Sequence, residues 1–140
     1  MKQYSLSIKN SQPTNNLKET KSPYDGTLVA SIEIADAAAL EQALKNAEHY
    51  FKTVMRELAA WERAAILYKV AELIRENVED LAMTIAREGG KPLKDARVEA
   101  ARAVNTVKMS GDEALQLNGE QISMDRAKGS ENVLAFTIRE

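Results

Sequence analysis

Apolar residues recur at helical spacing through the middle of the chain. The first amphipathic stripe runs from Leu40 to Val54 and follows Asp36, a residue type that is favoured at helix N-caps because its carboxylate accepts from free backbone amides. The pattern fades near Met55 and resumes at about Trp61, where we predict a second helix.

Two further helices are predicted on either side of Gly89-Gly90. Asn77 and Asp80 have the spacing of a capping box, which predicts a new helical segment there. Glycine tolerates the left-handed conformation that ends many helices, and Pro92 suits the first turn of the next helix. That helix is predicted to stop at Asn118-Gly119, which gives three to four amphipathic helices in all.

Alternating apolar and polar residues predict strands before the helices. Short strands are expected at 4–9 and 17–20, and a longer one at 28–34. The turn residues of Ser22–Gly26 predict a β-hairpin between the last two strands. One face of the longer strand is expected to carry its apolar side chains, namely Leu28, Ala30, Ile32 and Ile34.

The C-terminal part is predicted to hold a short extended piece at 121–124, a polar loop at 125–132 and an alternating strand at 133–138. We expect the last strand to have no partner nearby in sequence, so that it pairs with another part of a longer polypeptide or with another subunit. For the same reason we expect the isolated chain to self-associate or to be only marginally stable.

Composition narrows the function classes. The net charge is -2, which argues against nucleic acid as a partner. No apolar run approaches the roughly 20 residues that span a bilayer, and the first residues lack the apolar core of a signal peptide, so we expect no membrane partner and a cytoplasmic location. The chain has no cysteine, and its one histidine, His49, lies in a charged helical pattern and is expected to be solvated.

Short motifs follow one another in a defined order. Ser22–Gly26 resembles an N-P-x-x-G turn with Ser22 in place of Asn, and Trp61–Leu67 is similar to a W…R…L neighbourhood. Glu88–Pro92 matches E-x-G-K-P, and Ala96–Glu99 matches A-x-x-E. Phe136–Glu140 is similar to a strand that enters R-E-P-x-G-V. In this order and spacing the motifs resemble the N-terminal part of the aldehyde dehydrogenase superfamily.

The resemblance implies a fold. The chain would be an α+β fragment of the α/β cofactor domain of an aldehyde dehydrogenase, with an N-terminal β-hairpin, three to four amphipathic helices and a C-terminal strand. Residues 1–34 would form the strands and hairpin, and residues 35–119 a helical layer of the cofactor-binding domain. Residues 120–140 would form a loop and the first strand of the oligomerisation hairpin.

The resemblance also implies an activity. Members oxidise an aldehyde to an acid or an acyl thioester with NAD or NADP, using a Cys nucleophile, a Glu that activates water, and an oxyanion site. None of these catalytic or cofactor-binding residues can be placed in this sequence. We therefore expect the chain to be the N-terminal portion of a longer, homo-oligomeric enzyme, to be inactive alone, and to bind NAD(P) only as part of that enzyme.

Two site hypotheses follow from the resemblance. Glu88 is expected to hold a structural Na⁺ or K⁺ ion together with the backbone carbonyls of Thr20 and Lys21, since hard cations favour oxygen ligands. The alternative is a Glu88 hydrogen-bonded to local backbone. Arg102 is expected to face the substrate entrance and to bind a small anionic aldehyde, such as a semialdehyde or a triose phosphate. The alternative is a solvated Arg102 paired with Glu99.

Two other interpretations remain open at this point. A non-catalytic helical protein-interaction module would account for the amphipathic helices and the missing cysteine, but not for the linked motifs. Gly89-Gly90 could belong to a phosphate-binding loop, but neither GxGxxG nor GxxxxGK[ST] is present and no strand precedes them. A helix stop is the favoured interpretation of these glycines.

Overall fold

A three-stranded sheet opens the fold. The computed structural model describes residues 2–138 of the chain. Its first strands are β1 (Lys2–Tyr4), β2 (Leu17–Lys21) and β3 (Leu28–Glu33), in the spatial order β1-β3-β2. The β2–β3 pair is antiparallel and β1 lies parallel to β3, so the predicted hairpin is confirmed.

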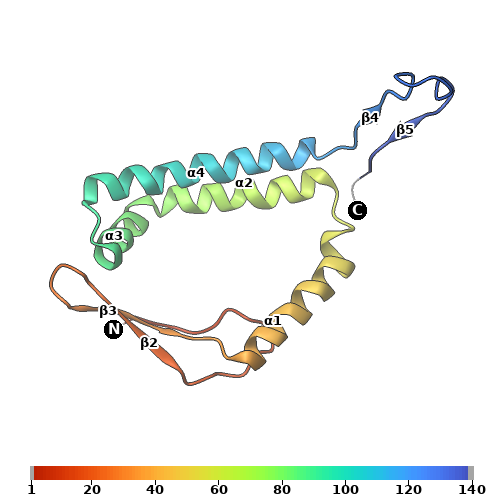
Figure 1. The fold of residues 1–140 in the computed structure, drawn as a ribbon. Coiled ribbons are helices and arrows are strands. Elements are labelled where there is room, and N and C mark those ends of the chain that lie inside the picture. The colour runs from red at the N-terminus through yellow and green to blue at the C-terminus, as the bar shows by residue number, and fades with distance from the viewer. Residues whose placement is uncertain (1, 139–140) are drawn as a thin grey trace.

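Helices make up the middle of the chain (Figure 1). Helix α1 (Ala37–Tyr50) continues through a π-helical turn, η1 (Phe51–Met55), and is followed by α2 (Ala60–Glu76), α3 (Val78–Gly89) and α4 (Leu93–Gln116). Helices α2 and α4 lie side by side along most of their length, and α3 packs at one end of α4. The prediction of three to four helices is confirmed.

The first strand differs from the prediction. A strand was expected at 4–9, but β1 ends at Tyr4. The backbone N–H of Leu6 donates to Glu33 Oε2 at 3.0 Å, and Ser11 N–H donates back to the Ile8 carbonyl at 3.1 Å. Because Leu6 and Ser11 use their backbone N–H groups in these bonds, the segment after Tyr4 does not continue the strand pairing with β3.

The faces of β3 also differ from the prediction. Ser31 and Glu33 are buried, at 8% exposure each, although they lie on the strand face opposite the predicted apolar one. Leu28 and Ile32, on the predicted apolar face, are 37% and 38% exposed. The reason is that the segment between β1 and β2 covers Glu33 and satisfies its carboxylate with backbone N–H groups.

The helix ends follow local chemistry in most cases. Asp36 Oδ1 accepts from Ala39 N–H at 2.8 Å, and Gly90 takes a left-handed conformation with φ 67° after α3, so both predictions are confirmed. The capping box at Asn77 is wrong, because its side-chain amide donates back to the Leu73 carbonyl at 2.8 Å. Pro92 lies one residue before α4, and that helix ends at Gln116, slightly earlier than expected.

The helical layer is held together by small residues. Its buried positions are all alanine or glycine, and no large side chain is fully buried among residues 2–138. Tyr68 of α2 lies directly on Gly111 of α4, where an added Cβ would come within 2.6 Å of Tyr68 Cε1. Small residues let two helices approach closely. The buried positions are Ala39 in α1 and, in α2–α4, Ala64, Ala71, Ala82, Ala96, Ala100, Gly111 and Ala114.

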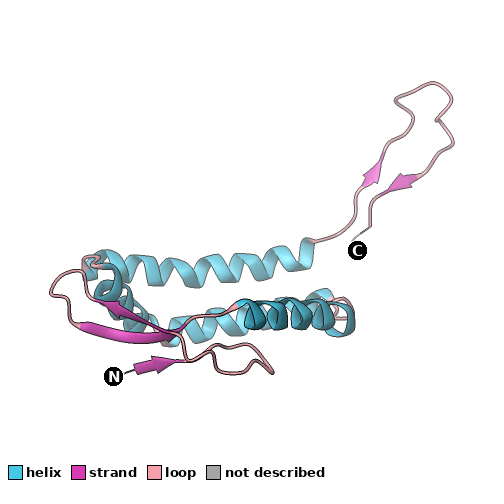
Figure 2. Cartoon of the chain, turned by 60° about the horizontal axis from the view of Figure 1, so that its bottom comes forward, coloured by secondary structure: helices cyan, strands magenta, loops and turns pink. Residues whose placement is uncertain are grey.

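The C-terminal strand has a partner within the chain, so the expectation that it would pair only elsewhere is wrong. Strand β4 (Gln121–Ile122) pairs antiparallel with β5 (Ala135–Phe136), and Thr137 N–H donates to the Glu120 carbonyl at 2.9 Å. The two strands form an arm that extends away from the end of α4 (Figure 2). Arg139 and Glu140 of the last motif lie outside the described residues.

Candidate functional site

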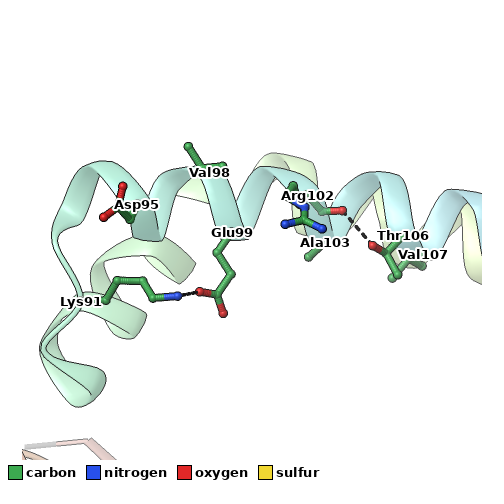
Figure 3. A pocket seen from close by; sticks show the side chains of 8 residues that line it. All are labelled: Lys91, Asp95, Val98, Glu99, Arg102, Ala103, Thr106 and Val107. Atoms are coloured by element: carbon green, nitrogen blue, oxygen red, sulfur yellow. Dashed lines mark hydrogen bonds and ion pairs between the residues drawn. The ribbon is translucent and has the colours of Figure 1, made fainter.

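An open groove of about 520 Å³ runs along one side of α4 (Figure 3). Lys91, just before the helix, closes one end of it, and the other lining residues recur at helical spacing on α4. Apolar and charged side chains therefore share one surface. The lining residues are Lys91, Asp95, Val98, Glu99, Arg102, Ala103, Thr106 and Val107.

The burial pattern of α4 explains why Arg102 lies on this surface. Ala96 and Ala100 are buried, in contact with the core around Ala82 of α3. Each residue turns an α-helix by about 100°, so Arg102 lies roughly 200° around the helix from Ala100. The alanines thus fix the helix against its neighbours and leave Arg102 on the groove side.

Some charged side chains of the groove are paired with one another and others are not. Lys91 Nζ donates to Glu99 Oε2 and the two form an ion pair, as the dashed line in Figure 3 marks. Glu99 is therefore paired with Lys91 and does not pair with Arg102, while Arg102 is exposed, as the alternative of a solvated arginine expects. Within residues 2–138 the guanidinium of Arg102 has no ion-pair partner. Its backbone carbonyl accepts from Thr106 Oγ1 at 3.1 Å.

The residues of the predicted cation site lie on two segments that meet. Gly90 at the end of α3 lies against Pro23 of the hairpin turn, where an added Cβ would come within 2.7 Å of Pro23 Cγ. Glu88 is exposed, and in the described part of the chain no hydrogen bond or ion pair joins it to Thr20 or Lys21. Lys21 Nζ pairs with Glu19 at 3.2 Å. The Na⁺ or K⁺ site therefore stays a prediction.

The Gly89-Gly90 pair does not form a phosphate-binding loop. The pair Gly89-Gly90 ends α3, with Gly90 N–H donating to the Ala86 carbonyl at 3.0 Å, so these glycines do not present free N–H groups at the start of a helix. Among residues 2–138 there is no cluster of three or more acidic or histidine side chains that could hold a metal ion. No described helix has the length and apolar character needed to cross a bilayer.

Sequence reasoning missed the buried Glu33. Backbone N–H groups of Leu6 and Thr14 donate to its carboxylate at 3.0 and 2.5 Å and, in that order, hold the pKa of Glu33 below its usual value. The available signal was a Glu at an alternating strand position together with a polar, Thr- and Asn-rich segment at 14–16, but only the fold brings them together.

Comparison with known proteins decides between an enzyme family and an interaction module. A family model for the aldehyde dehydrogenase family matches residues 9–140. This chain belongs to the aldehyde dehydrogenase family. It corresponds to an N-terminal segment of such enzymes and covers between 23% and 29% of the length of the curated relatives it matches.

Two relatives illustrate the similarity in sequence. The 3-sulfolactaldehyde dehydrogenase of Priestia megaterium is 31% identical over 140 residues, which covers 99% of this chain and 29% of that protein. The lactaldehyde dehydrogenase of Methanocaldococcus jannaschii is 34% identical over 118 residues, which covers 84% of this chain and 24% of that protein.

Solved aldehyde dehydrogenases share the fold of this chain. Aldehyde dehydrogenase 21 from Physcomitrella patens, in complex with the reaction product succinate, is 26% identical with a TM-score of 0.86, covering 96% of this chain and 28% of that one. An NADP-dependent glyceraldehyde-3-phosphate dehydrogenase from Bacillus halodurans, complexed with NADP, is 30% identical with a TM-score of 0.77, covering 84% and 24%. The predicted α+β architecture as part of an aldehyde dehydrogenase fold is therefore confirmed.

Proposed function

We propose that this chain forms the N-terminal part of an NAD- or NADP-dependent enzyme that oxidises a small anionic aldehyde to an acid. The observation that carries the proposal is the guanidinium of Arg102 in the α4 groove, which no described residue pairs. Its neighbour Glu99 is neutralised by Lys91, so Arg102 is available to an incoming anion. A guanidinium binds a carboxylate, sulfonate or phosphate through two parallel hydrogen bonds.

The relatives support a small substrate and often an anionic one. Their names specify a sulfonated aldehyde, a phosphorylated aldehyde and a dicarboxylate product, each of which carries a negative charge away from the reacting carbon. Lactaldehyde is neutral, which shows that the family similarity alone does not decide the charge of the substrate. Arg102 is the feature of this chain that favours the anionic class.

The test replaces Arg102 in the longer enzyme that contains this chain. Arg102→Leu removes the guanidinium while keeping an apolar stem at that position. We expect kcat/KM for a carboxylated or phosphorylated aldehyde to fall roughly thirty-fold, which corresponds to a loss of about 2 kcal/mol in transition-state stabilisation, because charge-assisted hydrogen bonds are the stronger class. A neutral aldehyde of the same length is expected to change little.

Two further variants sharpen the result. Lys94→Leu removes a cation from the same helix outside the groove lining and is expected to leave both substrates unaffected. Arg102→Lys keeps the charge but loses the second hydrogen bond, so an intermediate loss is expected. If Arg102→Leu slows both substrates equally, or neither, then Arg102 does not select the substrate.

The remaining properties of the whole enzyme are proposals of the same kind. We infer that it works as a homo-oligomer in the cytoplasm and that NAD or NADP binds outside this chain. This chain alone is then expected to reduce no NAD(P)⁺ with any aldehyde, because it holds no thiol nucleophile. An absorbance assay for NAD(P)H on purified chain tests this, and turnover would contradict it.

The cation hypothesis has its own test in the longer enzyme. If Glu88 and the carbonyls of Thr20 and Lys21 bind Na⁺ or K⁺, exchange of these ions for a bulky organic cation should lower the melting temperature. Glu88→Gln should remove that dependence on the ion. A melting temperature that is equal in all three salts would argue against the site.

A further inference from the structure

The segment between β1 and β2, residues 5–16, has no regular secondary structure but is fastened at both ends. We define it as the strap. It runs from the last residue of β3, Glu33, to the C-terminal part of α1 and returns to start β2. We propose that the strap, locked by the buried carboxylate of Glu33, holds α1 in place relative to the sheet. This inference is independent of the proposed function.

Glu33 is the fixed point at the sheet end of the strap. Its Oε2 accepts from Leu6 N–H at 3.0 Å, and its Oε1 accepts from Thr14 N–H at 2.5 Å and from Thr14 Oγ1 at 3.2 Å. Glu33 is 8% exposed as a residue, and its carboxylate accepts hydrogen bonds near both ends of the strap, from Leu6 and from Thr14. A buried carboxylate with these three donors would be left unsatisfied if the strap moved away.

Hydrogen bonds from the middle of the strap join it to α1. Lys9 Nζ donates to the Tyr50 hydroxyl at 2.6 Å, and Asn46 Nδ2 donates to the Lys9 carbonyl at 2.7 Å. Lys9 is therefore bound by its side chain and its backbone to the last two turns of α1.

The strap makes two reversals to cover this distance. Asn10 and Asn15 adopt positive φ values of 62° and 56°, the left-handed conformation that asparagine tolerates better than most residues. Asn10 follows the contact with α1, and Asn15 follows the contact with Glu33. The path of the strap is thus built into its backbone rather than left to a flexible loop.

Helix α1 has few other attachments. Ala39, near its first turn, is its one buried residue, while Leu40 and Leu44 are each 56% exposed. A short link at 34–36 joins the helix to β3 in the chain. The strap therefore supplies the second point that fixes the direction of α1, near Tyr50.

Limited trypsin digestion of the longer enzyme that contains this chain tests the proposal. Cleavage after Lys9 should be slow, because both its ammonium and its carbonyl are bound to α1. Glu33→Gln keeps one acceptor oxygen but loses the charge and the second acceptor. We expect cleavage after Lys9 to become about tenfold faster, because the loss of charge-assisted hydrogen bonds lets the strap open locally more often. Cleavage after Lys52, beyond α1, should rise with it.

Internal and matched controls separate the outcomes. Cleavage after Lys128, in the exposed β4–β5 loop, is the reference, and Glu41→Gln, an exposed charge change on α1, should behave as the unaltered chain. Thr14→Val is a milder change that removes the Thr14 hydroxyl, which lies within hydrogen-bond distance of both Glu33 Oε1 and the Ile34 carbonyl, and should give an intermediate effect. If Glu33→Gln leaves the cleavage rate after Lys9 unchanged, or raises cleavage equally after Lys9 and Lys128, then Glu33 does not lock the strap. If cleavage rises after Lys9 but not after Lys52, then the strap does not hold α1.

Discussion

The helical layer and the sheet with its strap are stabilised by different interactions. In α2–α4 the buried residues are alanines and a glycine, and the helices meet through close apolar packing. In the sheet region Glu33 is buried, and hydrogen bonds from the strap satisfy its carboxylate. The first region should therefore respond to changes in side-chain volume, and the second to changes in charge and pH.

Large apolar side chains lie on the outside of the helical layer and of the C-terminal arm. Trp61 and Met109 are 67% and 65% exposed on the helices, and Phe136 is 64% exposed in the arm. Exposed apolar side chains in numbers are typical of surfaces that bind other protein. The core of α2–α4 is thus made by small residues, with Val78, Ile85 and Leu93 partly buried against it, while many large apolar residues are exposed.

The largest effect is expected from added volume in the helical core. Ala100 is 3% exposed beside Ala82 and Ala96, so Ala100→Leu has no space for three further carbon atoms. We expect the free energy of unfolding in urea to fall by about 3 kcal/mol. Ala101→Leu, one residue along on the exposed side, is the matched control and should change it little. Equal effects at both positions would mean that the alanines do not define the core.

A smaller effect is expected where the two regions touch. Gly90 has φ 67°, and a Cβ there would come within 2.7 Å of Pro23 Cγ. Gly90→Ala should lower the free energy of unfolding by about 2 kcal/mol, since it combines a left-handed alanine with a clash. Gly89→Ala, at a helical position with open space around it, should be neutral or slightly stabilising, and thermal unfolding of both variants provides the measurement.

Lowering the pH should destabilise the strap before the helical layer. Donation by Leu6 and Thr14 N–H lowers the pKa of Glu33, so its contribution is present above the usual glutamate value, roughly pH 4.3, and is lost as the pH falls through the lowered pKa. Hydrogen exchange, corrected for intrinsic rates, should show the strap losing protection at acid pH before α2. Glu33→Gln should remove this pH dependence, and simultaneous loss in strap and α2 would contradict the separation.

The smallest effect is expected from a surface ion pair between α3 and α4. Arg97 donates through two nitrogens to the Glu79 carboxylate, at 2.9 Å from Nε to Oε2 and 2.6 Å from NH2 to Oε1, but both side chains are more than half exposed. Exposed pairs contribute little and are screened by salt. A double-mutant cycle on Arg97 and Glu79 should give a coupling near the detection limit that vanishes in about 1 M salt. A coupling free energy that persists at high salt would contradict the view that this ion pair contributes little.

Features governed by neighbouring residues could be predicted from the sequence. The turn at Ser22–Gly26, the cap at Asp36 and the stop at Gly90 each depend on local backbone chemistry. The position of β1 could not be predicted, because its parallel pairing with β3 depends on contacts between distant segments. The β4–β5 pair was missed for the same reason: a loop of polar residues separates two very short strands.

The candidate site was predictable only in part. The helical spacing and the family motifs pointed to Arg102 and Glu88 as residues of interest. The Lys91–Glu99 ion pair could not be foreseen, because Lys91 precedes the helix and its approach to Glu99 depends on how the chain turns at Gly90. Burial of Glu33 depends likewise on the path of the strap.

The contact between Tyr68 and Gly111 restricts sliding between α2 and α4. A helix moving along its neighbour passes from one stable register to the next in steps of one turn, about 5.4 Å. The Tyr68 ring occupies the notch left by Gly111, and its hydroxyl donates to Asp112 Oδ1 at 2.6 Å. A step in either direction would place the ring against a residue with a side chain and break this bond. The pair therefore selects a single register for the two long helices.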